Sequence, residues 1–172
     1  MKGAGQLQSL LEVSETCCTA GPSEQLREKV AAVILELHGV VAGFGYLKNA
    51  LACYTPIVPP RFLHRTQLGP DERARAFVHE LCNAALHPPG SADVAEHEDL
   101  AEERCAHEAA GRICRSHGVD DYRATMASHG VVVEPTQPDD EALISRMVDS
   151  VSAALRTPGL ASTWGRDGAD GL

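Results

Sequence analysis

The first feature of this 172-residue chain that could do chemistry is a histidine followed directly by a glutamate, His79 and Glu80, in a segment of helical periodicity. Asn83 lies four residues after His79, so the two side chains share one helix face. In zinc peptidases an H-E-x-x-H helix presents two imidazoles to one metal ion, and its glutamate is the general base. Here Asn83 stands where the second imidazole belongs, and a neutral carboxamide is a poor zinc ligand.

His87 does not supply the missing imidazole, because two helical turns set it about 12 Å along the helix axis from His79. A His-Glu pair is also a weak signal by itself. In a chain with eight histidines and 24 acidic residues, His97-Glu98 and His107-Glu108 occur as well. The interpretation of His79 therefore depends on the residues expected to lie near it.

A second pair of ionisable residues, Glu103 and His107, begins twenty residues after Asn83. The two are four residues apart and extend the apolar face of the next predicted helix. An unpaired charge on such a face is costly, so we expect a metal ion or a polar partner to lie against it. An alternative is a local Glu103–His107 pair, worth only about 0.3 to 0.5 kcal/mol if it is exposed.

These segments resemble the ImmA/IrrE family of zinc metallopeptidases. The resemblance covers residues from about 70 to 155, and the matching stretches are Arg73 to Leu81 (R-A-R-A-F-V-H-E-L), Ala85-Leu86-His87, Glu103-x-x-Ala106 and the helix end at Gly118-Val119-Asp120. It implies that His79 is a zinc ligand, Glu80 the catalytic base and Glu103 the third ligand. His107, from the opposite helix, would then substitute for the ligand absent at Asn83.

The resemblance implies a diverged zinc-metallopeptidase-like protein, a hydrolase with impaired catalysis, in a regulatory or mobile-element-associated role. Its substrate or partner would be a protein or peptide. A pseudoenzyme that keeps the fold as an interaction module is a second reading. A third is an unrelated, non-enzymatic helical module in which the His-Glu motif is accidental and His79 is an ordinary histidine hydrogen-bonded to Glu103.

Apolar periodicity predicts the elements that would position these residues. Helical spacing begins at Pro22 and continues as far as Phe44, and further helices are predicted over about 70–87, 93–118, 120–128 and 138–157. Prolines make residues 55–66 extended or a poor edge strand. Residues 131–133, three valines, could be a brief strand. We expect a mainly α fold (α+β with a minor, short-stranded sheet), to which the resemblance adds a small zincin-like helical core.

Length and composition indicate one domain over residues 22–157, with 1–21 as a flexible leader and the glycine-rich 158–172 as a disordered tail. The net charge of −9 argues against direct binding of a nucleic-acid backbone. Since no long apolar run or signal segment occurs, we expect a cytoplasmic protein without a membrane partner. Free thiols, mostly buried, are expected at the six cysteines: Cys17, Cys18, Cys53, Cys82, Cys105 and Cys114.

Overall fold

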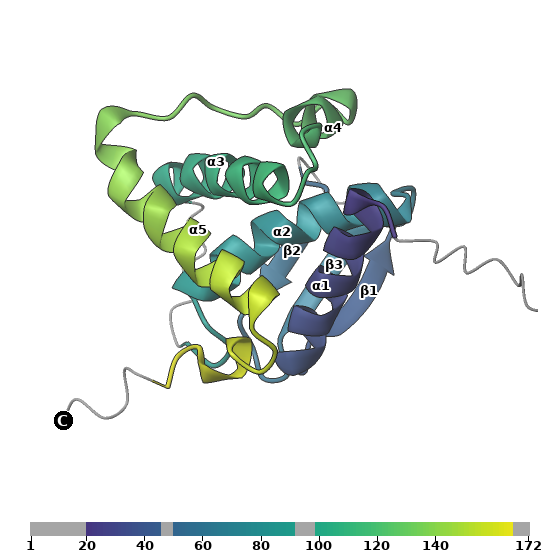
Figure 1. The fold of residues 1–172 in the computed structure, drawn as a ribbon, viewed down its shortest axis with the longest axis vertical. Helices are drawn as coiled ribbons and strands as arrows, with labels where there is room; N and C mark the ends of the chain where they lie inside the picture. Colours follow the sequence, from purple (N-terminus) through teal and green to yellow (C-terminus); the bar gives the residue numbers. More distant parts are fainter. Residues whose placement is uncertain (1–19, 46–49, 92–98, 167–172) are drawn as a thin grey trace, which may run out of the picture.

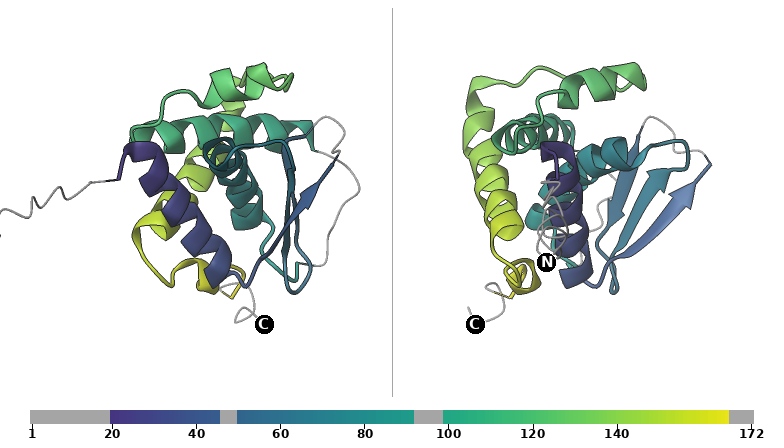
Figure 2. Two further views of the ribbon diagram at one scale, coloured as in Figure 1. Left: turned by 90° about the vertical axis from the view of Figure 1, so that its right-hand side faces the viewer. Right: turned by 45° about the vertical axis from the view of Figure 1, so that its right-hand side comes forward.

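The structure, a computed structural model, describes residues 20–45, 50–91 and 99–166. Its elements are α1 (Pro22–Glu36), β1 (Val40–Phe44), β2 (Ala52–Thr55), β3 (Arg61–Arg65), α2 (Pro70–Leu86), α3 (Leu100–Ser116), α4 (Tyr122–Ser128), the short 3-10 helix η1 (Pro138–Asp140), α5 (Glu141–Arg156) and a second one, η2 (Ala161–Thr163). The helices pack on one face of a three-stranded sheet (Figures 1 and 2). The predicted fold class, mainly α with a minor short sheet, is confirmed.

The first helix ends before its helical spacing does. The N–H of Gly39 donates to the carbonyl of Ile34 at 2.9 Å, and His38 adopts a left-handed φ of 56°. A Cβ atom at residue 39 would lie 2.8 Å from side-chain carbons of Ile34 and Phe62, so only glycine fits this turn. The helical spacing as far as Phe44 does not correspond to helix beyond this point, because the chain reverses here and residues 40–44, rich in valine, pair as β1.

The sheet has the order β1-β3-β2, with β1 parallel and β2 antiparallel to β3. The segment predicted to be a poor edge strand therefore supplies the central strand, because Pro59 and Pro60 precede β3 and leave its hydrogen bonds intact. Phe62 is fully buried on the helix-facing side of β3. The brief strand predicted at 131–133 is absent, since the N–H of Val131 bonds to the carbonyl of Met126 at the end of α4.

Small side chains let α2 and α3 approach each other closely. Three alanines of α3 and one of α2 are completely buried: Ala106, Ala109, Ala110 and Ala84. Larger side chains from α1 and α5, among them Val33 and Met147, fill the rest of the core. The thiols of Cys82, Cys105 and Cys114 are free and buried, as predicted, while Cys17 and Cys18 lie outside the described residues. None of the described helices is long and apolar enough to cross a membrane.

A bidentate ion pair fixes the start of α5 against α3. Arg104 donates to both carboxylate oxygens of Asp140, at 2.6 and 2.8 Å, and the N–H of Gln137 donates to the same carboxylate at 2.7 Å. Such two-pronged arginine–carboxylate contacts are more directional than single ones. The long connection after α4 is thereby tied to the helix that carries Glu103.

The packed domain extends past the predicted boundary at residue 157. Ala161, in η2, is completely buried, and Trp164 packs against the core. The predicted disorder is therefore wrong for residues 158–166, because an alanine and a tryptophan within the glycine-rich segment are apolar enough to bury. Residues 167–172, and residues 1–19 of the predicted leader, lie outside the described residues.

We predict that Trp164→Ala lowers the free energy of unfolding by about 1 to 3 kcal/mol, because a large, partly buried aromatic surface is removed. The matched control is Arg166→Ala, which changes an exposed side chain two residues later and should be neutral. Urea denaturation, monitored by far-ultraviolet circular dichroism so that the signal does not depend on tryptophan, measures the free energy of unfolding of both variants. Equal stabilities of the two variants would place the end of the domain back at residue 157.

Candidate metal centre

Three potential metal ligands meet where α2 crosses α3. His79 comes from the third turn of α2, and Glu103 and His107 come from successive turns of α3. The register of α3 is set at its start, where Asp99 caps the helix by accepting from the N–H groups of Ala101 and Glu102. Helical spacing then places Glu103 and His107 one above the other on the face that meets α2.

The carboxylate of Glu103 lies between the two imidazoles. Its Oε1 is 3.3 Å from Nε2 of His79 and 3.3 Å from Nε2 of His107. The two rings are stacked at a tilt, with centroids 4.2 Å apart. One ligand atom from each residue lies within 4.8 Å of the other two. The predicted meeting of His79 with Glu103 is confirmed, and His107 joins them.

These separations suit a single ion of zinc's size. With zinc–ligand distances of about 2.0 to 2.1 Å, neighbouring ligand atoms of a tetrahedral site are about 3.3 to 3.4 Å apart. The two Glu103–imidazole distances of 3.3 Å equal that edge length. Two imidazoles and one carboxylate are also a donor set that zinc accepts with a fourth position left open. The three side chains therefore form a possible metal site.

Tyr122 orients the imidazole of His107. The Tyr122 hydroxyl lies 2.7 Å from Nδ1 of His107, inside the core, so Nε2 is directed at Glu103. Burial raises the pKa of Tyr122 well above its usual value, so the hydroxyl keeps its proton. A hydrogen bond at one ring nitrogen fixes which nitrogen faces a metal.

Two ion pairs hold α4, and with it Tyr122, against α2. The almost fully buried Arg75 donates to Asp121 at 2.6 and 3.0 Å, directly before Tyr122 in the chain. At the other end of α4, His129 contacts Glu72 at 2.9 Å. His129 is the C-terminal cap of α4, and His117 is that of α3. His97 lies outside the described residues.

Glu80 lies beside the three ligands but is not one of them. Its Oε1 is 4.0 Å from Nε2 of His79, its side chain is almost fully buried, and its Oε2 accepts from the carboxamide of Asn83 at 3.4 Å. The backbone N–H of Tyr54, in β2, also donates to this carboxylate. Burial raises the pKa of Glu80, and repulsion from the Glu103 carboxylate raises it further. The hydrogen bonds from Asn83 and Tyr54 lower the pKa, but they do not offset this rise.

The ligand residues are electrostatically coupled. Burial disfavours the charged form of Glu103, but its hydrogen bonds with His107 and His79 outweigh that cost and hold its pKa well below the usual value. Burial lowers the pKa of His107, and the neighbouring His79 lowers it further. For His79, burial also acts to lower the pKa, yet Glu103 and Glu80 together raise it. A bound cation would stabilise this arrangement, in which a charged carboxylate lies between two imidazoles.

One nitrogen of His79 has no partner. Its Nδ1 is buried and makes no hydrogen bond within the described part of the chain, whereas its Nε2 faces Glu103. A buried polar atom without a partner costs free energy, so the ring is held in place by packing and by the contact at Nε2. The stabilisation of this orientation must come from the Nε2 side, where the other two ligands lie.

A cavity of about 30 Å³ opens at the cluster. His79, Glu80, Glu103 and His107 line it, together with Met126 and residues around the start of β2. That volume is sufficient to hold a water molecule. The side chain of Glu103 is half exposed, so the cavity can be reached from solvent at this residue.

The structure separates the residues that the sequence singled out. Asn83 does not line the cavity and instead holds Glu80, and His87 turns away to contact Glu102 at 2.7 Å. Sequence reasoning missed Tyr122, which holds His107 from outside the motif helices, and Arg75, on α2 itself, which pairs with Asp121 beside Tyr122. The one signal of this buried ion pair in the sequence was Arg75 itself, an arginine on the apolar side of a predicted helix.

We predict that Tyr122→Phe lowers the free energy of unfolding by about 1 to 3 kcal/mol, because the buried Nδ1 of His107 loses its partner. Tyr54→Phe is the matched control. It removes a hydroxyl that donates to the carbonyl of His87 at 2.9 Å in a half-buried position, so its loss should be smaller. Chemical denaturation measures the stability of both variants. Nitrogen-15 NMR of the histidine rings should show a changed tautomer balance of His107 in Tyr122→Phe alone. A larger loss in Tyr54→Phe would contradict this role of Tyr122.

No protein-family model, curated protein or solved structure matches this chain. The functional interpretation therefore rests on the geometry of the cluster and on the chemistry of its residues.

Proposed function

We propose that this protein is a zinc-binding, metallopeptidase-like protein in which His79, Glu103 and His107 hold the ion. The observation that carries the proposal is the convergence of two imidazole nitrogens on one carboxylate oxygen, each at 3.3 Å. In this arrangement His107 provides the imidazole that the motif lacks at Asn83. The resemblance to the ImmA/IrrE family remains part of the proposal.

A zinc ion bound there would supply a Lewis acid and lower the pKa of a water that it holds. The protein's own contribution to hydrolysis is the carboxylate of Glu80, which we assign as the proton acceptor. Asn83 and the N–H of Tyr54 fix its orientation, and its raised pKa makes it a better base. The cavity opens to solvent where Glu103 is exposed, so a peptide bond would approach from that side.

The competing reading is a metal-free cluster that only stabilises the crossing of α2 and α3. In that case Glu103 would neutralise a protonated imidazole, and no ion would bind. The two readings differ in the response to zinc, because a purely structural ion pair has no affinity for a divalent metal.

We predict that chelator-treated protein binds one zinc ion per chain, and that His107→Asn weakens the binding at least ~100-fold because one of three protein ligands is lost. The matched control is His87→Asn, the same substitution outside the cluster, which should leave the affinity unchanged. Isothermal titration with zinc, with folding checked by circular dichroism, gives the stoichiometry and both constants. Absence of saturable binding, or equal weakening by both substitutions, would support the metal-free reading.

We also predict that Glu80→Gln keeps zinc binding but slows hydrolysis of a mixture of fluorescence-quenched peptides by about 10²- to 10⁴-fold relative to the native protein. Glutamine preserves the shape of the side chain and removes the proton acceptor. The control is Glu102→Gln, a change of the same kind at a residue that contacts His87 instead of the ligands. Equal hydrolysis by native protein and Glu80→Gln would rule out the assigned role of Glu80, whatever the result for zinc.

A further inference from the structure

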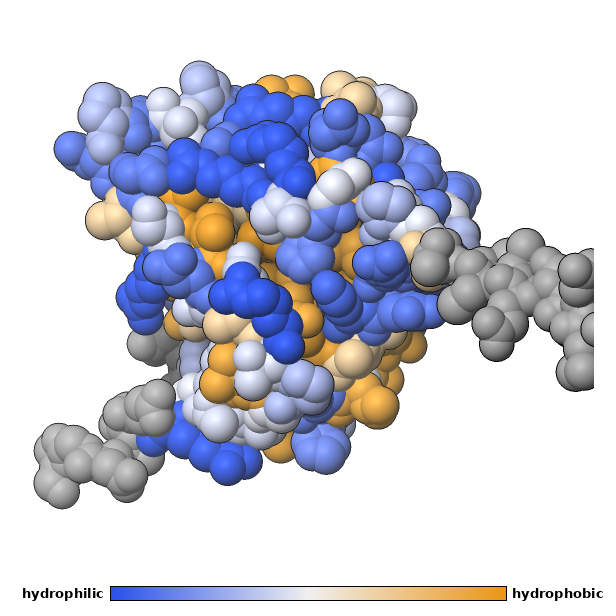
Figure 3. Space-filling model, viewed as in Figure 1, coloured by the Kyte–Doolittle hydropathy of each residue, from blue (hydrophilic) through white to orange (hydrophobic). Residues whose placement is uncertain are grey.

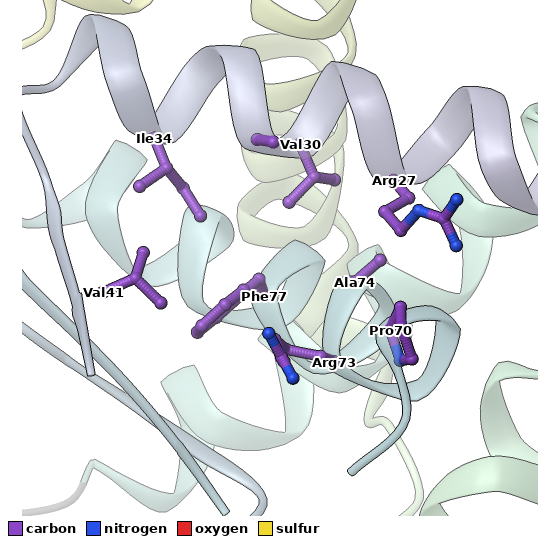
Figure 4. Close-up of a pocket in the computed structure, with 9 residues that line it drawn as sticks. Arg27, Val30, Ile34, Val41, Pro70, Arg73, Ala74 and Phe77 are labelled. Carbon is purple, nitrogen blue, oxygen red and sulfur yellow. The ribbon is translucent and has the colours of Figure 1, made fainter. Parts of the chain in front are cut away.

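A second and larger cavity lies against an earlier part of α2. It measures about 220 Å³ and is formed by α1, α2 and β1 (Figure 4). Seven of its lining residues are apolar: Val30, Ala31, Ile34, Val41, Pro70, Ala74 and Phe77. The side chains of Arg27 and Arg73 stand beside this apolar lining. We call this feature the α1–β1 groove.

The groove is separate from the candidate metal centre. Ala74 and Phe77 face the groove, whereas His79 and Glu80, farther along α2, face the small cavity at β2. The strands at the two sites are also different, because β1 and β2 are opposite edges of the three-stranded sheet. Apolar surface gathers over α1 and the strands beside it, at the lower right of the space-filling view (Figure 3).

The two arginines of the groove differ in their partners. Arg27 contacts Asp71 at 3.2 Å and Glu24 at 3.9 Å. For Arg73, Nε is buried and has no hydrogen-bond partner within the described residues. A buried guanidinium nitrogen without an acceptor costs free energy, so an acidic group placed at Arg73 would be stabilised.

The outer edge of β1, which pairs with no further strand in the described part of the chain, adds backbone groups to the site. The N–H of Val40 donates to Pro60 and the carbonyl of Phe44 accepts from Thr66, so these residues point their backbone groups towards β3. Hydrogen-bonding direction alternates along a strand, and the N–H and C=O groups of Val41 and Gly43 therefore point away from the sheet. Such an edge is a template for a further strand. The side chains of Val40, Val41 and Phe44 are each nearly half exposed, at 49%, 45% and 46%.

We propose that the α1–β1 groove binds an extended segment of a partner protein, which adds to β1 as a fourth strand. One apolar side chain of the segment enters the cavity, and an acidic side chain of the segment pairs with Arg73. Strand addition of this kind takes its affinity from backbone hydrogen bonds and its specificity from side-chain pockets.

Two other occupants fit less well. A small apolar carboxylate would leave the edge of β1 unused, and the cavity is below the roughly 300 to 1,000 Å³ of sites that enclose a drug-sized ligand. A second copy of the chain, pairing β1 with β1, would bring the segment Gly39–Gly45, which contains no acidic residue to meet Arg73. An acidic and apolar peptide strand uses the edge, the cavity and the guanidinium together.

The test uses the full chain and two fluorescein-labelled octapeptides, one alternating leucine with glutamate and one alternating leucine with lysine. By fluorescence anisotropy, the glutamate peptide should bind saturably and at least ~10-fold more tightly than the lysine peptide. Arg73→Gln should weaken the binding of the glutamate peptide by a similar factor. The control is Arg146→Gln, on α5, which should change nothing. Equal binding of the two peptides, or no binding of either, would overturn the proposal.

Val41→Pro tests the edge itself. Proline removes an N–H that points away from β3, so the sheet should persist, as checked by circular dichroism, while peptide affinity falls at least ~5-fold. Unchanged affinity in a folded Val41→Pro protein would overturn strand addition, and the Arg73→Gln result stands even if Val41→Pro fails to fold. Octanoate binding as tightly as the glutamate peptide would identify a small-carboxylate site instead. Sedimentation showing a dimer that Val41→Pro dissociates would identify a second copy as the occupant, and either result would contradict the proposal.

Discussion

The close approach of α2 and α3 is the contact on which the candidate metal centre depends. Buried alanines at the crossing, among them Ala106 and Ala110, leave room for two imidazole rings with centroids 4.2 Å apart. Bulky residues at these positions would separate the helices and remove one ring from reach of the carboxylate. The polar cluster is costly to bury, so the hydrophobic packing around it must hold His79 and His107 in place. Arg75 and Tyr122 add a second layer of hydrogen bonds behind His107.

The sequence alone predicts much of this arrangement. Helical periodicity locates α2 and α3, and spacing of four residues predicts that Glu103 and His107 share a face. The contribution of Tyr122 could not be predicted, because a short helix follows a turn whose direction depends on tertiary ion pairs such as Arg75–Asp121. The strand β1 was missed since valines at helical spacing continue past Gly39, and only the contact of that glycine with Phe62 shows why the chain must turn.

The helix α2 joins two sites of different character. His79 and Glu80 line a small cavity at β2 among charged groups. Phe77 and Arg73, nearer the start of α2, line the apolar groove at β1, where one guanidinium nitrogen has no hydrogen-bond partner among the described residues. A peptide held at β1 would lie on the other edge of the sheet from the metal ligands. The two proposals are therefore independent. The zinc proposal would hold even if no partner binds at β1, and the partner proposal would hold even if no zinc binds.

The central claim is that one metal ion lies between His79, Glu103 and His107, and anomalous X-ray diffraction tests it most directly. Crystals of the native protein grown with zinc should be measured just above and just below the zinc absorption edge. A zinc ion bound there should give one strong difference peak per chain, about 2.0 to 2.2 Å from Nε2 of both histidines and from a carboxylate oxygen of Glu103. A map without a peak at this position, in crystals where the three side chains are well ordered, would contradict it.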